Sequence, residues 1–186
     1  MNTLETISNR RSVRSFADKP IPKETLLTLI KAGSLAPTGA NAQPWRFVVI
    51  TDQKTRADLA TLALPRYKVW MEKYGQGMKE MREEYDSKLK DSIYYSAPAV
   101  VFVIGLGMTG DQDCPMACEN IMLAARSLEI GSCWVYFGQL VLDDPKVRTL
   151  LELKEGEKVY GPIVLGYPKA GFPPSPPKKE PVIKWI

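Results

Sequence analysis

The chain has 186 residues, of which 45% are hydrophobic and 25% are charged, which predicts one soluble domain over residues 1–186 and excludes a disordered or fibrous protein. The net charge of +4 is too small for a dedicated nucleic-acid-binding protein, which usually has a strongly basic face. The sequence contains no histidine, which excludes Ser-His-Asp and Cys-His catalysis and most zinc sites, so we expect a cofactor to supply any difficult chemistry.

Hydrophobic periodicity and the positions of glycine and proline predict helices alternating with strands. Helices are expected at residues 3–9, 21–30, 54–64, 113–128 and 147–153. Short runs rich in β-branched and aromatic residues predict buried strands at 45–51, 99–105, 133–137 and 159–165. This order predicts a three-layer α/β or α+β domain.

Residues 67–95 are charged and rich in Met, Tyr and Glu, with Gly75 and Gly77 in the middle. We interpret this segment as two helical pieces with a break between them, forming a flap or insert. Charged residues 79–90 are expected to form a solvated surface. The larger side chains either line a substrate channel or belong to the core, as is more usual for such residues at helical spacing: Trp70, Met71, Tyr74, Met78, Met81 and Tyr85.

The last part of the chain, residues 168–186, is predicted to be an extended arm. It has five prolines between Pro168 and Pro177, and these exclude a strand interior there. Residues 181–186 then regain the apolar character of a strand. An apolar strand at the end of a proline-rich arm favours a tail that crosses onto a partner subunit.

Two polar segments are candidates for ligand binding. The first has three guanidinium groups and a hydroxyl within five residues, a combination that suits a phosphate: Arg10, Arg11, Ser12 and Arg14. In extended chain Arg10, Ser12 and Arg14 would point the same way, although a solvated basic turn is the alternative. The second is the loop over residues 36–47, whose amides would either face a heteroaromatic ring or satisfy their own backbone.

The three cysteines, Cys114, Cys118 and Cys133, are an odd number without the spacing of a disulfide scaffold. We expect buried, reduced thiols in a cytoplasmic protein and no metal site, because an iron–sulfur cluster usually has four thiolate ligands. The adjacent Glu119 and Asn120 are assigned to packing or dimer contacts rather than to a ligand. No apolar stretch reaches the roughly 18–20 residues that a membrane span requires, and no signal peptide is expected at the N-terminus.

Three motifs in order, RRSVRSF, NAQPWRF and ENIMLAARSLEIGSCW, resemble the FMN-dependent nitroreductase family. The similarity runs from Arg10 to the last strand, with residues 67–95 as the exception. It implies an α+β, three-layer α/β/α fold with a mostly antiparallel sheet. It also implies a homodimer with FMN at the subunit interface and a C-terminal strand exchanged across the dimer.

The resemblance also implies roles for individual positions. Arg10, Ser12 and Arg14 would hold the FMN phosphate and ribityl chain, with Arg11 close by. Asn41 and Gln43 would contact the flavin ring or its polyol, and the backbone around Tyr136, Phe137 and Gly138 would approach the N5 edge. Lys178 and Lys179 occupy a tail region where the family more often has an arginine for the phosphate, so the contact there would be weaker.

The implied activity is NAD(P)H-dependent reduction of FMN, followed by transfer of electrons to a small nitroaromatic, quinone or enone acceptor at the same site. Neither the acceptor nor the preference for NADH or NADPH follows from the sequence. An alternative is an FMN carrier or sensor that has no turnover. A basic module for nucleotides or nucleic acid is a third possibility, but no aromatic platform accompanies Arg10–Arg14.

Overall fold

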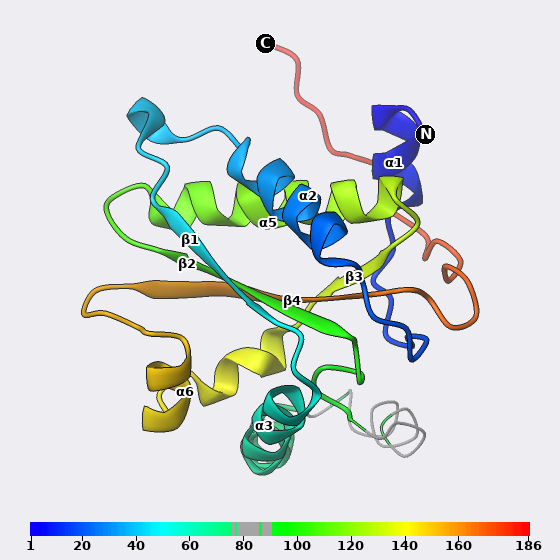
Figure 1. Cartoon of the computed structure of the whole chain (residues 1–186). Coiled ribbons are helices and arrows are strands. Elements are labelled where there is room, and N and C mark those ends of the chain that lie inside the picture. The colour runs from blue at the N-terminus through cyan, green and yellow to red at the C-terminus, as the bar shows by residue number, and fades with distance from the viewer. Residues whose placement is uncertain (76, 78–85, 87–90) are drawn as a thin grey trace.

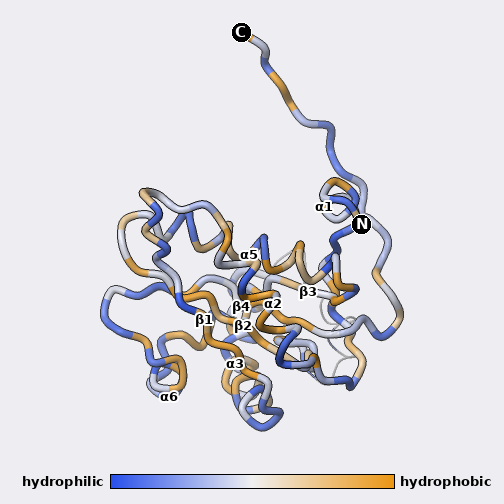
Figure 2. The backbone as a smooth tube through the Cα atoms, turned by 45° about the horizontal axis from the view of Figure 1, so that its top comes forward, coloured by the Kyte–Doolittle hydropathy of each residue, from blue (hydrophilic) through white to orange (hydrophobic). Residues whose placement is uncertain are grey.

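A computed structural model describes residues 1–75, 77, 86 and 91–186. The described residues form a four-stranded, fully antiparallel sheet in the order β1-β2-β4-β3. The strands are β1 (Trp45–Ile50), β2 (Ala99–Gly105), β3 (Gly131–Trp134) and β4 (Lys158–Gly166). The predicted strand at 181–186 is not observed, since these residues extend away from the sheet and pair with no strand among the described residues (Figures 1 and 2).

Helices cover both faces of the sheet, which confirms the three-layer arrangement (Figure 1). One face carries α2 (Lys23–Ser34) and α5 (Gly110–Ser127), with α1 (Thr3–Asn9) beside the end of α5. The other face carries α3 (Gln53–Tyr74) and α6 (Pro145–Leu150), together with the 3-10 helix η2 (Tyr136–Val141). A second 3-10 turn, η1 (Gly39–Asn41), precedes β1. In the part of the chain that the structure describes, no helix is long and apolar enough to cross a membrane.

The central strand β2 divides two hydrophobic cores by simple alternation. Its seven residues are all buried. Val101 and Val103 face α2 and α5, whereas Val100 and Phe102 face α3 and η2. A strand buried on both faces appears in sequence as a continuous apolar run, so this element was predicted with its observed bounds.

Helix α3 is longer than the sequence predicted and includes residues 67–74 of the expected flap. Pro65 lies inside it, but a proline removes only one backbone donor, and packing compensates for this loss. Leu59, Ala63 and Tyr67 are buried against the core on both sides of Pro65. The predicted end of the helix at residue 64 is therefore too early. Most of the remaining flap, residues 76–90, lies outside the described residues apart from Gly77 and Asp86.

The predicted strand at 133–137 begins and ends earlier, at Gly131–Trp134. The Val135 amide donates to the Pro162 carbonyl at 2.8 Å, after which the chain turns into η2. Tyr136, Phe137 and Gly138 therefore belong to a 3-10 helix at the end of β3 rather than to the strand. The sequence resembles a strand here because Val135 and Phe137 pack on the core while Tyr136 between them is exposed, which is the alternation expected of a strand.

Candidate functional site

The arginine segment lies along the free edge of β3. Ser12 forms a parallel bridge with Ser132, and the Val13 amide donates to the Ser132 carbonyl at 2.9 Å. The Val13 side chain is buried against Gly131, where a β-carbon would lie 2.8 Å from the Val13 side chain. Because side chains alternate in extended chain, Ser12 and Arg14 point away from Val13, as the sequence predicted.

Arg10, Ser12 and Arg14 all act on the same buried sulfur. Burial raises the pKa of Cys133, while the charge of Arg14, a hydrogen bond with Ser12 and the charge of Arg10 act in the opposite direction. Ser12 is bridged to Ser132, the residue before Cys133, and Arg10 and Arg14 lie two residues on either side of Ser12 in the same segment. The predicted phosphate-binding residues therefore form one arginine cluster beside β3.

Arg10 and Arg11 also have partners within the chain. Arg10 pairs with Glu119 of α5, with 3.2 Å between Nε and Oε1, while 29% of the Arg10 side chain remains exposed. The Arg11 guanidinium donates backward to the carbonyls of Ser8 and Arg10, at 2.7 and 2.6 Å. Arg11 therefore stabilises the C-terminal end of α1, where unpaired carbonyls favour a cation.

The turn η2 lies at the other end of β3 from the arginine cluster. Ser132, which pairs with Ser12, is four residues before Tyr136, and four residues of extended chain span about 13 Å. Gly138 is required by packing, because a β-carbon there would lie 2.6 Å from Pro162 and 2.8 Å from Tyr94. The Tyr94 hydroxyl donates to the Gly138 carbonyl, and burial raises the pKa of Tyr94.

The loop with Asn41 and Gln43 has an unusual backbone. Ala40, Asn41 and Gln43 all have positive φ angles, of 52°, 54° and 46°. For residues other than glycine this conformation costs roughly 1 kcal/mol or more each, and such strain is concentrated at functional sites. The Gly39 amide donates to buried Asp113 at 3.3 Å, and Gln43 Nε2 donates to Asn41 Oδ1 at 3.2 Å.

This loop and the arginine cluster lie at opposite ends of the sheet in one chain. Gln43 is two residues before Trp45, which is in register with Gly105 and, through it, with Lys158 at the start of β4. Ser132 is instead in register with Leu165 near the end of β4. Leu165 is seven residues after Lys158, a span of about 23 Å, and β1 is also separated from β3 by two strands. One chain does not bring the two predicted motifs together.

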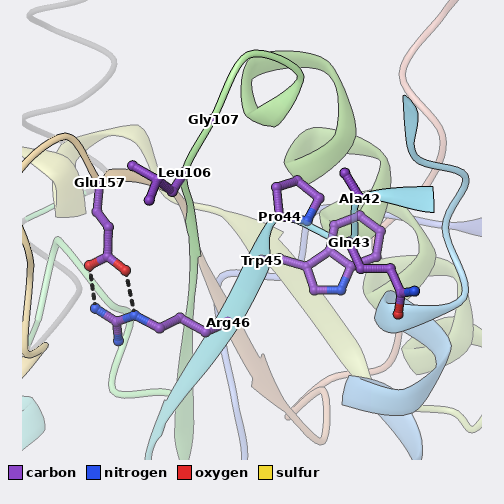
Figure 3. A pocket seen from close by; sticks show the side chains of 8 residues that line it. All are labelled: Ala42, Gln43, Pro44, Trp45, Arg46, Leu106, Gly107 and Glu157. Atoms are coloured by element: carbon purple, nitrogen blue, oxygen red, sulfur yellow. Dashed lines mark hydrogen bonds and ion pairs between the residues drawn. The ribbon is translucent and has the colours of Figure 1, made fainter. Parts of the chain in front are cut away.

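An open depression of about 400 Å³ lies beside the loop, where β1 begins and β2 ends. Gln43 and Ala42 line one end, and the ion pair between Arg46 and Glu157 closes the other (Figure 3). Leu106 and Gly107 complete the wall. The depression is a small-molecule-sized surface next to the strained loop.

Arg46, within the NAQPWRF motif, has a structural role that the sequence did not reveal. Its guanidinium bonds Glu157 at 2.8 and 2.6 Å and also donates to the carbonyls of Leu151 and Glu152. Only 8% of the Glu157 side chain is exposed, and the hydrogen bond from Arg46 lowers the pKa of Glu157 to about 2. The two residues are 111 positions apart, so no local pattern relates them.

We expect Glu157→Gln to lower the free energy of unfolding by about 2 kcal/mol at pH 7, because the bidentate ion pair with Arg46 is replaced by a weaker hydrogen bond to a neutral amide. The native pKa lies below the ordinary value of 4.5, so the contribution is complete above about pH 5 and is lost as the pH falls toward 2. Urea unfolding at pH 7 and pH 3 measures the difference, with the exposed Glu155→Gln as control. A difference that does not shrink on acidification would contradict the assignment.

The tail, which extends away from the body of the molecule toward the C-terminus (Figure 1), carries Lys178 and Lys179, and both are exposed. Phe172 is the last residue with a partly buried side chain. The apolar end is unusually exposed, at 102% for Val182, 88% for Trp185 and 112% for Ile186. The structure therefore does not place the two lysines against the arginine cluster of the same chain.

Aromatic side chains from α3 pack against η2. Trp70 lies 5.1 Å from Phe137 and 5.9 Å from Tyr136, measured between ring centroids, and 5.6 Å from Tyr74. Tyr67 packs against Phe137 at 4.7 Å. Tyr74 and Tyr136 remain more than half exposed. Of the channel residues proposed from sequence, Met78, Met81 and Tyr85 lie outside the described residues, while Trp70 adjoins Tyr136 and Tyr74 adjoins Trp70.

The cysteines are buried and unpaired, as predicted, and they pack in the core. Burial raises the pKa of Cys114 to about 11 and that of Cys118 to about 12. Gly105 is needed beside Cys114, because a β-carbon there would lie 2.3 Å from the sulfur. Glu119 and Asn120 are also engaged in packing contacts, with Arg10 and with the Ala32 carbonyl respectively.

A four-stranded antiparallel sheet between two helical layers, with these motifs at its edges, defines an α+β fold of the nitroreductase type. The model of the nitroreductase family matches residues 7–167, and the chain belongs to this family. Among solved structures it is similar to a nitroreductase with bound FMN from Bacteroides fragilis. The two are 34% identical with a TM-score of 0.79, over 100% of this chain and 99% of the other.

Relatives within the family have different activities. The chain is 27% identical to an FMN reductase (NADPH) of Bacillus subtilis, over 96% of this chain and 71% of that protein. It is 30% identical to a 5,6-dimethylbenzimidazole synthase of Rhodospirillum rubrum, over 88% of this chain and 81% of that protein. Membership of the family therefore defines the class of enzyme and leaves the acceptor open.

Proposed function

We propose that this protein is an FMN-dependent oxidoreductase that takes electrons from NADH or NADPH and passes them to a small organic acceptor. The observation that carries the proposal is the arrangement along β3. It has a cluster of two guanidiniums and a hydroxyl at one end and the exposed start of η2 about 13 Å away at the other. FMN, when bound, supplies the hydride-accepting chemistry, which no amino-acid side chain provides.

The residues present fit FMN as a ligand. Arg10 and Arg14 would hold the phosphate with charge-assisted hydrogen bonds, and Ser12 would add a neutral donor. The backbone around Tyr136–Gly138 would approach the reactive edge of the ring. Asn41 and Gln43 would offer amides to the ring or polyol from a loop that is already strained into position.

A homodimer with two composite sites reconciles this assignment with the separation of the motifs. The arginines and η2 of one subunit would meet the loop with Asn41 and Gln43 of its partner, since about 23 Å separates the motifs along one sheet. A two-fold axis makes both sites equivalent. The exposed apolar tail would cross to the partner and bring Lys178 and Lys179 toward a phosphate. Buried, unpaired cysteines support a cytoplasmic location.

Complementation between two defective subunits tests the composite site. Arg10→Ala removes one half, and Asn41→Gly with Gln43→Gly removes the other half while glycine tolerates the positive φ angles. Each variant alone is expected to bind little FMN. Co-expressed with different affinity tags, the heterodimer should regain one FMN per dimer, because one of its two sites then has both normal halves. If each FMN site were instead formed by a single subunit, both sites of the heterodimer would carry a defect, and the heterodimer would bind little FMN.

The acceptor is expected to be flat and largely apolar. Trp70, Tyr74 and Tyr136 present partly exposed rings next to the proposed flavin edge, and aromatic rings stack favourably with planar ligands. Nitroaromatics, quinones and enones all have this shape.

The absorbance spectrum of the purified protein, followed by anaerobic addition of NADH or NADPH, tests the proposed function. Bound oxidised flavin that is bleached by the nicotinamide supports the oxidoreductase. Flavin that remains yellow with both donors would contradict it and favour a carrier, a sensor or a different electron donor. Protein that does not take up added FMN would contradict the cofactor assignment.

A further inference from the structure

Arg126, near the end of α5, connects three segments that are distant in sequence. Its Nε donates to the Asn9 carbonyl at 3.0 Å, and its guanidinium carbon lies 3.9 Å from the centroid of the Phe172 ring. A third contact joins it to Glu129 at 2.7 Å. Only 13% of the Arg126 side chain is exposed, so its guanidinium is largely covered where it meets these segments, although 67% of the Glu129 side chain is exposed.

The contact with Asn9 stabilises the end of α1. This helix has only seven residues and has no basic residue in its last turn. Short helices are marginal without tertiary support, and their last carbonyls lack partners within the helix. Arg126 supplies both a donor and a positive charge at that end. Asn9 is directly followed by Arg10, so the contact fixes the point from which the arginine segment begins.

Helix α5, which carries Arg126, also contacts the Arg10 side chain. Glu119 pairs with the Arg10 side chain and lies seven residues before Arg126 on α5. Residues seven apart lie on one helical face, two turns from each other. One face of α5 therefore holds the Asn9 backbone and the Arg10 side chain at the same time.

The third segment joined by Arg126 is the start of the tail. Phe172 stacks on the guanidinium and is followed by residues 173–186, all of which are exposed. Just before it, residues 167–169 pair with the other end of the arginine segment. The Ala17 amide donates to the Tyr167 carbonyl at 2.8 Å, and the Lys169 amide donates to the Ser15 carbonyl at 3.1 Å. The arginine segment is thus held between α5 and the first residues of the tail.

We propose that Arg126 is a positioning residue for the phosphate site, and that Phe172 links this site to the tail. Arg126 holds Arg10–Arg14 in the phosphate-binding arrangement through the Asn9 carbonyl, and its stacking on Phe172 makes that arrangement depend on the seating of the tail. The inference rests on the proposed function, because it assumes that the arginine segment binds the FMN phosphate.

The ratio of the dissociation constants of riboflavin and FMN tests the proposal, since riboflavin lacks the phosphate. Quenching of flavin fluorescence by the full-length apoprotein measures both. In Arg126→Met the ratio is expected to fall about tenfold, with the riboflavin constant unchanged. Arg126→Lys should show most of this loss, because one ammonium group does not both donate to Asn9 and stack flat on Phe172. Phe172→Leu should lower the ratio about threefold.

Arg148→Met, an exposed arginine on α6 across the sheet, is the matched control and should keep the wild-type ratio. Circular dichroism checks that each variant is folded. A wild-type protein that binds neither flavin, or binds both equally, would contradict the proposed function itself. A wild-type preference for FMN that persists in Arg126→Met and Phe172→Leu would overturn this inference alone, as would an equal loss of riboflavin and FMN binding.

Discussion

Replacing Arg10 or Arg14 with alanine is expected to remove FMN from a protein that remains folded. Each guanidinium would donate charged hydrogen bonds to the phosphate, and the loss of such a partner costs about 1.5–3 kcal/mol, or roughly 10- to 150-fold in affinity. The effect on folding should be small, because Glu119, the partner of Arg10, is half-exposed and can be solvated. The ratio of flavin to protein absorbance after gel filtration measures the loss.

Arg11→Ala is the matched control for this experiment, since it removes the same charge from the same segment. The Arg11 guanidinium is directed to the carbonyls of Ser8 and Arg10, so its loss removes no phosphate contact and should lower FMN affinity less than Arg10→Ala, through the end of α1 alone. A small decrease in melting temperature with most FMN retained is expected. Full flavin content in both Arg10→Ala and Arg14→Ala would refute the phosphate site.

Deleting residues 174–186 is expected to convert the dimer into monomer or aggregate. Val182, Ile183, Trp185 and Ile186 are all at least 60% exposed in the single chain. Burial of large apolar side chains on a partner contributes about 1.5–3 kcal/mol each, which is several kcal/mol for each tail. The truncation still keeps Phe172 on Arg126, so the body of the subunit should fold. Size-exclusion chromatography with light scattering measures the assembly.

Full-length Lys178→Ala/Lys179→Ala is the control for the truncation. It keeps the apolar end of the tail, so it should remain dimeric while its affinity for FMN decreases modestly through the loss of positive charge. A truncated protein that forms a stable dimer of native size would refute strand exchange through the tail. Unchanged FMN affinity in the double-lysine variant would remove these two residues from the phosphate site.

The strained loop and the arginine segment were both recognised from their residue types, but their relation in space was not. Asn41 and Gln43 are polar residues before a buried strand, and Arg10–Arg14 is a basic run, and both features are local. Their separation along the sheet depends on strand order and register, which link Trp45 to Lys158 and Ser132 to Leu165. The sequence therefore predicted two binding segments, and the topology places them at opposite ends of the sheet, which is why the site proposed above combines two subunits.

By itself, the sequence determined the features that arise from short-range periodicity. The strand at 99–105, the helix at 3–9 and the alternation around Val13 all follow from side chains a few residues apart. It also predicted buried thiols, which the structure confirms, and a cofactor that carries the chemistry, because the residue types limit the alternatives.

Only the tertiary structure decided where helix α3 ends, how Arg46 is used and what holds the arginine segment. Pro65 predicts a break, yet core packing around Ala63 and Tyr67 continues the helix. The partners of Arg46 and Arg126 are more than 40 residues away, at Glu157, Asn9 and Phe172. Such contacts form only when the register of the sheet and the docking of helices bring the groups together. No local sequence pattern indicates which distant residues will meet.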